Sequence, residues 1–204
     1  IHYSTRYGGS EKYIDKQHRE LQNIILYLKG KSHEDVLNEF QKDFLKESEE
    51  GNLTQDEYYF LWKIFCESKN MPLIIYKQEF LNKISNYPNM TSDYLIGIRH
   101  FRTFWTETIV VDKNGEYEIS ELNELFTIWL NGNKVNTVNE YQLLDIIKHF
   151  FPEVSFIGKN LLNIRCNLWN KCEDIQKCLN NSKEKLKEKD HNMLEIYKLY
   201  CIYA

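Results

Sequence analysis

Glycine, proline, long apolar runs and excess positive charge are all scarce in this sequence. Of its 204 residues, 8 are glycine and 3 are proline, so we expect few loops and many helices. No apolar run reaches the roughly 18 residues of a membrane-spanning helix and no signal peptide opens the chain, so we expect no membrane contact. Lys and Arg total 26 against 30 Asp and Glu, a formal charge of −4, which excludes a uniformly basic nucleic-acid binder.

Recognisable metal, nucleotide and nucleophile motifs are also missing. The five cysteines are odd in number and form no CxxC pair, so we expect reduced thiols in a cytosolic or nuclear protein. The six histidines form no HExxH pair. Gly30-Lys31-Ser32 matches the end of a phosphate-binding loop, but Ile25 stands where that loop needs its first glycine. The sequence therefore predicts no catalytic, metal-binding or cofactor-binding residue in this chain.

Aromatic residues, by contrast, are abundant. They make up 14% of the chain, with 11 Phe, 14 Tyr and 4 Trp, which excludes a disordered polypeptide. The chain begins at Ile1 without a methionine, and we expect it to be part of a longer polypeptide. Its patterns predict a mainly α fold with small β-hairpins, of the α+β class, in which tandem winged-helix-like units follow a helical hairpin.

The helical hairpin is predicted for residues 1–50. Apolar residues recur at helical spacing over residues 11–29. The capping box Ser32-x-x-Asp35 then begins a second helix. The acidic run over residues 46–52 is predicted to be a linker.

Residues 51–105 are predicted to be a first winged-helix-like unit. The capping box Thr54-x-x-Glu57 begins a helix that ends before Pro72, and a short second helix follows. Residues 94–98 have strand character. Two helices, a loop and a strand follow the order of a helix-turn-helix with a wing.

Residues 106–170 are predicted to be a second unit of the same kind. Strand-like residues flank Asn114-Gly115, which predicts a hairpin turn between them. Ser120 is predicted to cap one helix that ends at Gly132, and the capping box Thr137-x-x-Glu140 begins another. A β-hairpin is predicted over residues 154–157 and 161–164, joined by a turn at 158–160, and C-terminal helices are predicted over residues 171–204.

Regional charge separates the two winged-helix-like units. Residues 51–105 carry a net charge of +1, whereas residues 106–170 carry −4. Basic side chains and amides are the groups that contact phosphates and base edges. The candidate DNA-binding residues are Lys77, Gln78, Lys83, Arg99 and Arg102 in the first unit and Lys148, Lys159 and Arg165 in the second. For the acidic second unit, a protein–protein role is favoured over DNA contact.

A set of aromatic motifs resembles one known family. The matching stretches are Tyr58 to Cys66, Pro72, Phe80 to Ile84, Phe104-Trp105-x-Glu107-Thr108-Ile109, Glu118-Ile119-x-Glu121-Leu122, Gln142-Leu143-Leu144-Asp145, Phe150-Phe151-Pro152 and Asn167-Leu168-Trp169-x-Lys171. Over roughly residues 54–180, this pattern resembles the C-terminal region of poxvirus-type helicase-primases, superfamily 3 AAA+ proteins of large nucleocytoplasmic DNA viruses. The Asn-, Ile-, Lys- and Tyr-rich vocabulary fits an AT-rich viral genome.

The resemblance implies a parent protein that is a hexameric, ATP-driven replicative helicase with primase activity. The Walker A, Walker B and arginine-finger motifs are absent here, so the ATP and magnesium of the parent have no site in this chain. The implied role is a non-catalytic C-terminal module that contacts DNA or a replication partner, such as the parent helicase ring. The implied location is a cytoplasmic viral replication site or the nucleus of an infected cell.

A second function stays open beside the first. The acidic second unit and the aromatic faces near both ends also suit a protein-interaction scaffold that docks an oligomer or a polymerase without touching DNA.

Overall fold

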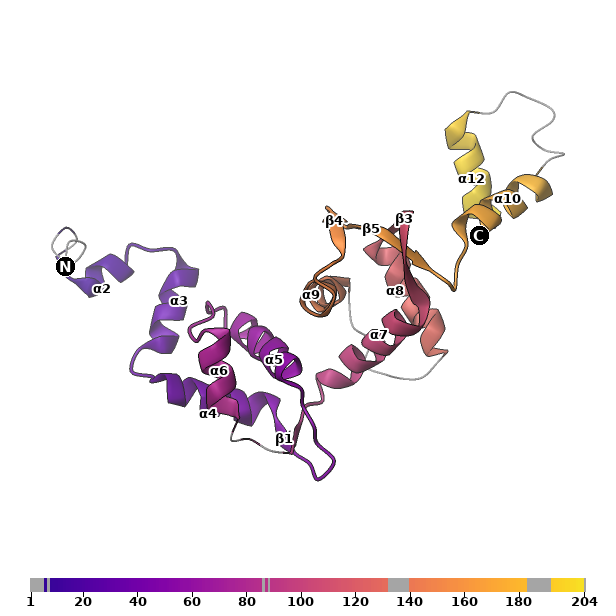
Figure 1. The fold of residues 1–204 in the computed structure, drawn as a ribbon. Coiled ribbons are helices and arrows are strands. Elements are labelled where there is room, and N and C mark those ends of the chain that lie inside the picture. The colour runs from indigo at the N-terminus through magenta and orange to yellow at the C-terminus, as the bar shows by residue number, and fades with distance from the viewer. Residues whose placement is uncertain are drawn as a thin grey trace. The chain divides into compact units, whose positions relative to one another are not determined.

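The computed structural model describes residues 6, 8–85, 87, 89–131, 140–182 and 192–203. The described chain is mainly helical and carries two small antiparallel sheets, as expected for the α+β class (Figure 1). It divides into two compact units, Ile1–His100 (unit 1) and Phe101–Ala204 (unit 2). The division falls within helix α7 (Leu95–Thr108), which contributes residues to both units.

Unit 1 is built mostly from helices, with two short strands between them. They are α2 (Ser10–Ile14), α3 (Arg19–Leu28), α4 (His33–Phe44), β1 (Lys46–Glu47), α5 (Gln55–Ser68), α6 (Lys77–Ile84), β2 (Met90–Thr91) and the start of α7. The capping boxes predicted at Ser32 and Thr54 are confirmed, since each side chain accepts from the backbone N–H three residues on. They begin α4 and α5.

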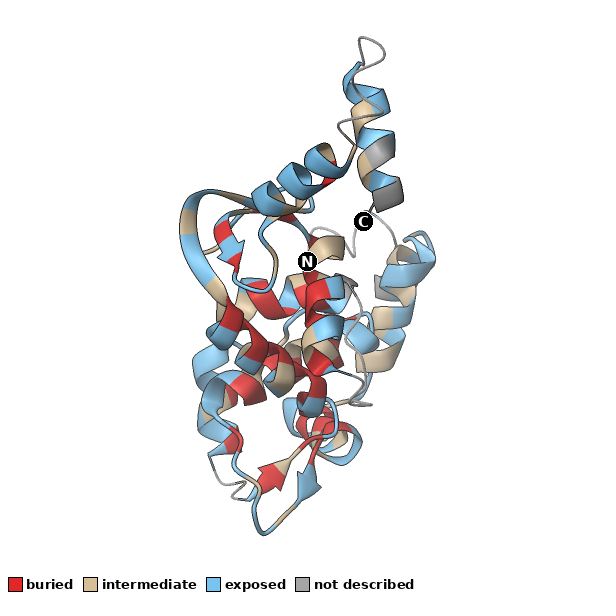
Figure 2. Cartoon of the chain, turned by 90° about the vertical axis from the view of Figure 1, so that its right-hand side faces the viewer, coloured by how far each residue is buried: buried red, intermediate tan, exposed pale blue. Residues whose placement is uncertain are grey.

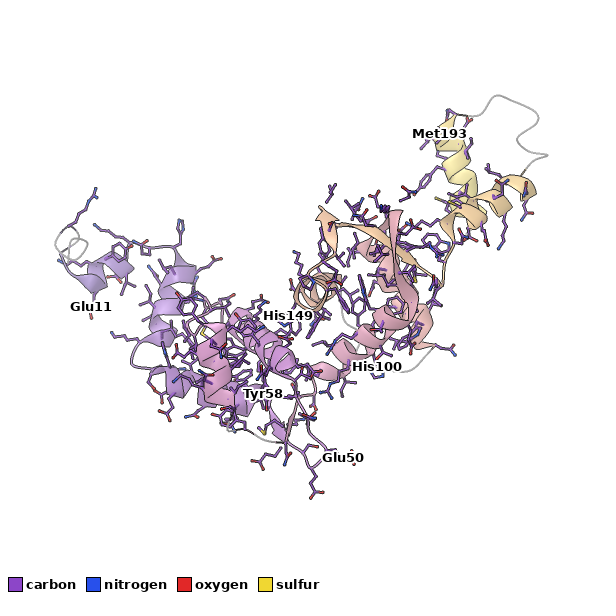
Figure 3. The ribbon with its side chains drawn as sticks, in the orientation of Figure 1. Glu11, Glu50, Tyr58, His100, His149 and Met193 are labelled. Atoms are coloured by element: carbon purple, nitrogen blue, oxygen red, sulfur yellow. The ribbon has the colours of Figure 1, made fainter. Side chains whose placement is uncertain are left out.

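An aromatic cluster forms the core of unit 1. The Phe40 ring of α4 lies 5.5 Å from Trp62 and 5.6 Å from Phe65, both on α5. It also lies 5.7 Å from Phe80 of α6, and all four side chains are fully buried. The Tyr58 hydroxyl of α5 donates to the carbonyl of Tyr87 over 2.9 Å, which ties α5 to the segment after α6 (Figure 3). Edge-to-face aromatic packing therefore holds three helices together.

The helix predicted over residues 11–29 is broken into α2 and α3. The Gln22 side-chain amide donates to the carbonyls of Ile14, Asp15 and Gln17, each over 3.1 Å. These bonds add a side-chain donor to carbonyls at and just after the end of α2, so they stabilise the break between the two helices.

Two other predictions for unit 1 are wrong. Residues 94–98 are not a strand: α7 begins at Leu95, and Leu95 and Ile98 are buried three residues apart, as on one helix face. The predicted linker over residues 46–52 instead contains β1, whose Lys46 pairs with Thr91 of β2. Among the described residues of unit 1, no two-stranded hairpin therefore follows α6.

Unit 2 contains a small sheet and several helices. After α7 come β3 (Ile109–Glu118), α8 (Ile119–Leu130), α9 (Glu140–Phe150), β4 (Ser155–Ile157), β5 (Asn160–Cys166), α10 (Lys171–Asn181) and α12 (Met193–Tyr203). The sheet order is β3-β5-β4, with both pairs antiparallel, and the predicted hairpin of β4 and β5 is confirmed. Phe101 and Phe104 of α7 pack against Phe126 of α8 in the core, whereas α10 and α12 are largely exposed (Figure 2).

The turn predicted at Asn114-Gly115 is wrong, because β3 passes through it as one strand. The register against β5 shifts between Val111 and Glu116, which marks an irregularity in the strand rather than a hairpin end. A Cβ on Gly115 would lie 2.0 Å from the Ile164 carbonyl oxygen, so the glycine permits close backbone approach. Asn114-Gly115 therefore marks the strand irregularity and not the hairpin turn that was predicted.

The boundaries of α8 also differ from the prediction. Glu118, and not Ser120, is the N-cap residue, and its backbone N–H donates to the Glu121 carboxylate over 2.9 Å. The helix ends at Asn131, which adopts the left-handed conformation with φ of 47°. The predicted signals at Gly132 and Thr137 lie outside the described residues.

Candidate nucleic-acid interface

Three candidate DNA-binding residues lie on α6 of unit 1, and each has a partner. Lys77 Nζ lies 2.9 Å from Asp56 Oδ1, and Lys83 Nζ lies 3.9 Å from Glu79 Oε1. The Gln78 amide donates to the Asn82 side chain over 3.3 Å. The α6 surface therefore pairs each lysine with a carboxylate and offers phosphates little net positive charge.

Arg99, on α7, binds a buried carboxylate inside unit 1. Its Nε donates to Glu57 Oε1 over 2.8 Å and its Nη2 donates to Glu57 Oε2 over 3.0 Å. Nη2 also donates to the Asn52 carbonyl over 2.9 Å. The Glu57 side chain is only 3% exposed, and the same carboxylate accepts from the backbone N–H of Thr54 in the α5 capping box. Arg99 thus neutralises the buried charge that begins α5.

The pKa of Glu57 is lowered and that of Arg99 is raised, as expected for an ion pair. Burial acts to raise the pKa of Glu57, but the hydrogen bonds from Arg99 and Thr54 outweigh it, so this pKa is lowered overall. The hydrogen bonds to Glu57 raise the pKa of Arg99. The charged forms are therefore stabilised together, and an Arg99 that left Glu57 to bind DNA would leave that carboxylate unpaired.

Arg102 was predicted to belong with the first unit, but it lies in unit 2. The guanidinium carbon sits 4.6 Å from the centre of the Phe150 ring of α9. Contacts of this kind hold an arginine side chain over an aromatic face without removing its charge. Arg102 therefore links α7 to the end of α9 within unit 2.

The three remaining candidates also lie in unit 2. Arg165 of β5 faces Asp112 of β3, with 3.4 Å between Nε and Oδ2. Lys148 is exposed on α9, and its ammonium lies 5.9 Å from the centre of the Phe156 ring of β4. Lys159 is exposed in the turn between β4 and β5. Neither Lys148 nor Lys159 has a carboxylate within ion-pair distance among the described residues.

The structure therefore divides the candidate set by charge state. Lys77, Lys83, Arg99 and Arg165 are ion-paired, whereas Lys148 and Lys159 have no carboxylate within ion-pair distance among the described residues. Both of these lysines lie in unit 2, for which a protein partner was expected rather than DNA. Counting charges along the chain missed this, because pairing depends on which side chains meet in the fold.

A cluster of functional-looking residues at the start of α10 escaped the candidate list. Lys171 Nζ donates to the Glu121 carboxylate over 2.6 Å and to the Glu116 carbonyl over 2.8 Å. It also lies 4.1 Å from the centre of the Tyr117 ring and 5.1 Å from that of Trp169. The sequence motif Trp169-x-Lys171 contains two of these residues, and in the structure both pack at the start of α10.

The same cluster fixes the chain on both sides of Lys171. The Tyr117 hydroxyl donates to the Trp169 carbonyl over 3.0 Å, and the Trp169 indole N–H donates to Asp174 over 2.6 Å. The Asn170 side chain caps α10 by accepting from the backbone N–H of Glu173. These bonds attach the beginning of α10 to β3 and α8.

Among the described residues, no group of three or more His, Cys, Asp or Glu side chains is arranged to hold a metal ion. Burial raises the pKa of the Cys66 thiol to about 12, so this side chain is a buried, protonated core residue. In the described part of the chain, no helix has both the length and the apolar character needed to cross a membrane.

In comparisons with protein families, curated proteins and solved structures, none matched this chain.

Proposed function

We propose that this chain is a non-catalytic winged-helix module of a viral replicative helicase-primase that contacts a replication partner or DNA. The observation that carries the proposal is the order α7–β3–α8–α9–β4–β5 in unit 2, with the sheet order β3-β5-β4. Helix, strand, two helices and a two-stranded hairpin paired with the first strand is the winged-helix arrangement. In this assignment α9 is the helix that meets the ligand and the β4–β5 turn is the wing.

Unit 1 supports a second winged helix less well. Its α5 and α6 follow one another as a helix-turn-helix, with a left-handed Asn70 at φ of 51° in the connection. The strand that would form a wing after them is instead the first turn of α7. We therefore propose that unit 1 is a helical domain that does not itself contact DNA.

The link to a helicase-primase rests on the aromatic motifs, whose residues have structural roles here. Phe104 and Trp105 lie in the core of unit 2, where Trp105 stacks on Phe151 with ring centres 4.6 Å apart. Trp169 and Lys171 attach α10 to the sheet. These motif residues pack the core and attach α10. Proteins that share the same C-terminal module are expected to share such packing residues.

Charge pairing favours a protein partner over DNA as the main ligand. The candidate cations Lys77, Lys83 and Arg99 are ion-paired, and β3, which pairs with the wing strand β5, carries the exposed carboxylates of Glu116 and Glu118. DNA contact is the second candidate, and it rests on Lys148 and Lys159. Because few phosphates would be neutralised, this contact is weak and sensitive to salt.

The test is a fluorescence-anisotropy titration of the whole chain with a labelled DNA duplex at low and at physiological salt. The double variant Lys148→Glu/Lys159→Glu is expected to lose at least about tenfold in affinity, since two phosphate contacts become repulsive. The control Lys177→Glu reverses an exposed charge on α10 and is expected to bind as the wild type does. Equal binding by all three proteins would remove the winged-helix DNA contact.

A further inference from the structure

We infer that the outward face of the β3-β5-β4 sheet docks a basic, apolar segment of a partner protein. The inference rests on the proposed function and names the chemistry of the partner. The pairing of the strands shows which residues share a face, because opposite residues in an antiparallel sheet point to the same side.

The inward face of the sheet is fully used by the core of unit 2. Tyr117 of β3 lies opposite Leu161 of β5, which lies opposite Phe156 of β4. Tyr117 is 3% exposed and Leu161 is 0% exposed. Residues in the neighbouring rows therefore point outward, away from this core.

The outward rows depart from the polar composition expected of a solvent-facing sheet. One row holds Glu116, Leu162 and Ser155, and the next holds Glu118, Asn160 and Ile157. Ile157 is 69% exposed, and Leu162 is half-buried. Antiparallel sheets with one solvated face place polar residues at such positions, so apolar side chains there indicate a contact surface.

A third outward row extends the apolar character along the strands. Val110 of β3 lies opposite Arg165 of β5 and is 36% exposed. The positive charge of Arg165 is compensated by Asp112 on the same strand as Val110. The sheet face thus combines the exposed side chains of Val110 and Ile157 with the carboxylates of Glu116 and Glu118, whose rows hold no lysine or arginine.

The charge on this face selects the occupant. Glu116 and Glu118 are exposed on β3, and the Lys171 ammonium nearby is already bound to Glu121 and to the Glu116 carbonyl. A nucleic acid would be repelled by these carboxylates, and an acidic peptide would be too. A segment that alternates lysine or arginine with aliphatic residues complements both the carboxylates and the apolar rows.

The experiment is an NMR titration of the ¹⁵N-labelled whole chain with a synthetic peptide of alternating lysine and valine. Amide shifts are expected to cluster in Val110, Ile157 and Leu162 and their neighbours. A peptide with glutamate in place of lysine is expected to cause no shifts. Shifts scattered over other surfaces, no shifts with the lysine peptide, or equal shifts with both peptides would overturn the inference.

Matched variants separate this face from the rest of unit 2. Ile157→Asp and Glu116→Lys are each expected to weaken peptide binding about tenfold, as loss of a central contact does. The controls are Ile128→Asp, at a residue that is 67% exposed on α8, and Glu124→Lys, also exposed on α8. Both controls are expected to bind like the wild type, and a control that weakens binding equally would contradict the assignment.

Separate variants distinguish peptide binding at the sheet face from DNA binding by Lys148 and Lys159. Ile157→Asp is expected to leave the DNA titration unchanged, whereas Lys148→Glu/Lys159→Glu is expected to retain peptide binding. A chain that binds DNA through those lysines but not the lysine peptide keeps the proposed function and loses the docking face. Peptide binding at the sheet without DNA binding removes the DNA contact and keeps the face.

Discussion

At the residue scale, Arg99 shows why a basic residue in a helix-turn-helix context need not bind DNA. It lies on α7 and makes two hydrogen bonds to Glu57, a carboxylate that is 3% exposed, and a third to a backbone carbonyl. The same carboxylate accepts from the first N–H of the α5 cap. One side chain therefore supports helix initiation and the attachment of α7 within unit 1.

Replacing Arg99 with alanine is expected to lower the free energy of unfolding by about 2–3 kcal/mol, since it leaves a buried carboxylate without its cation. Urea denaturation followed by circular dichroism measures this. Lys83→Ala, which removes one side of an exposed pair at 3.9 Å, is the control and is expected to cost less than about 0.5 kcal/mol. A similar loss in both variants would show that the Arg99 pair has no special role.

The lowered pKa of Glu57 also makes a pH dependence testable. A group whose pKa is lower in the folded state stabilises the fold above its unfolded pKa, and the effect is lost as pH falls through the folded value. The wild type is therefore expected to be more stable than Glu57→Gln at about pH 7, and the gap is expected to close towards about pH 3. Thermal denaturation across this range checks it, and a gap that stays constant would contradict the assignment.

At the element scale, the start of α10 depends on tertiary bonds rather than on its own helix propensity. Lys171 joins α10 to β3 and to α8, and its ammonium lies 4.1 Å from the centre of the Tyr117 ring and 5.1 Å from that of Trp169. Side chains of Lys171 and Glu121 are each about one-third exposed, 30% and 32%. The attachment is thus partly shielded and stronger than a pair at the open surface.

Lys171→Met keeps the length of the side chain and removes its charge. We expect it to lower the free energy of unfolding by about 1–2 kcal/mol and to speed chymotrypsin cleavage after Trp169, because α10 then detaches more often. Limited proteolysis measures the second effect. Lys177→Met, at an exposed position on the same helix, is expected to be cleaved at the wild-type rate.

Local sequence signals predicted the elements whose causes are local. The capping boxes at Ser32 and Thr54 act within one turn and were read correctly, as was the β4–β5 hairpin. The strand expected over residues 94–98 failed because the same apolar residues can serve either period, and burial of Leu95 and Ile98 selects a helix. The course of β3 through Gly115 depends on the distant Ile164 carbonyl, which no local pattern reveals.

The candidate site was predictable only in residue type. The sequence showed which residues are basic, but the partners of Lys77, Arg99 and Arg165 come from other segments of the chain. Pairing between residues far apart in the sequence depends on how the chain folds, so the sequence alone does not show it. The regional charge count therefore pointed to the first unit, whereas the candidate lysines with no carboxylate in ion-pair distance among the described residues are Lys148 and Lys159 of unit 2.

At the scale of the whole molecule, the chain has one unit built mostly from helices, in which Lys77, Lys83 and Arg99 are ion-paired, and a second unit with the element order β3–α8–α9–β4–β5. The formal charge of −4 conceals this division, because paired and unpaired cations count equally in it. We propose DNA contact at α9 and the β4–β5 turn, and protein contact at the outward sheet face. Both proposed surfaces belong to unit 2: the first carries Lys148 and Lys159, and the second carries Glu116 and Glu118.

Hydrogen–deuterium exchange of the whole chain, with and without a DNA duplex at low salt, tests the central claim most directly. The account predicts protection confined to the residues of α9 and the β4–β5 turn around Lys148 and Lys159, with α6 and the Arg99 region unchanged. Protection centred on α6 and Arg99 would contradict it, because the cations of unit 1 would then be available to DNA after all.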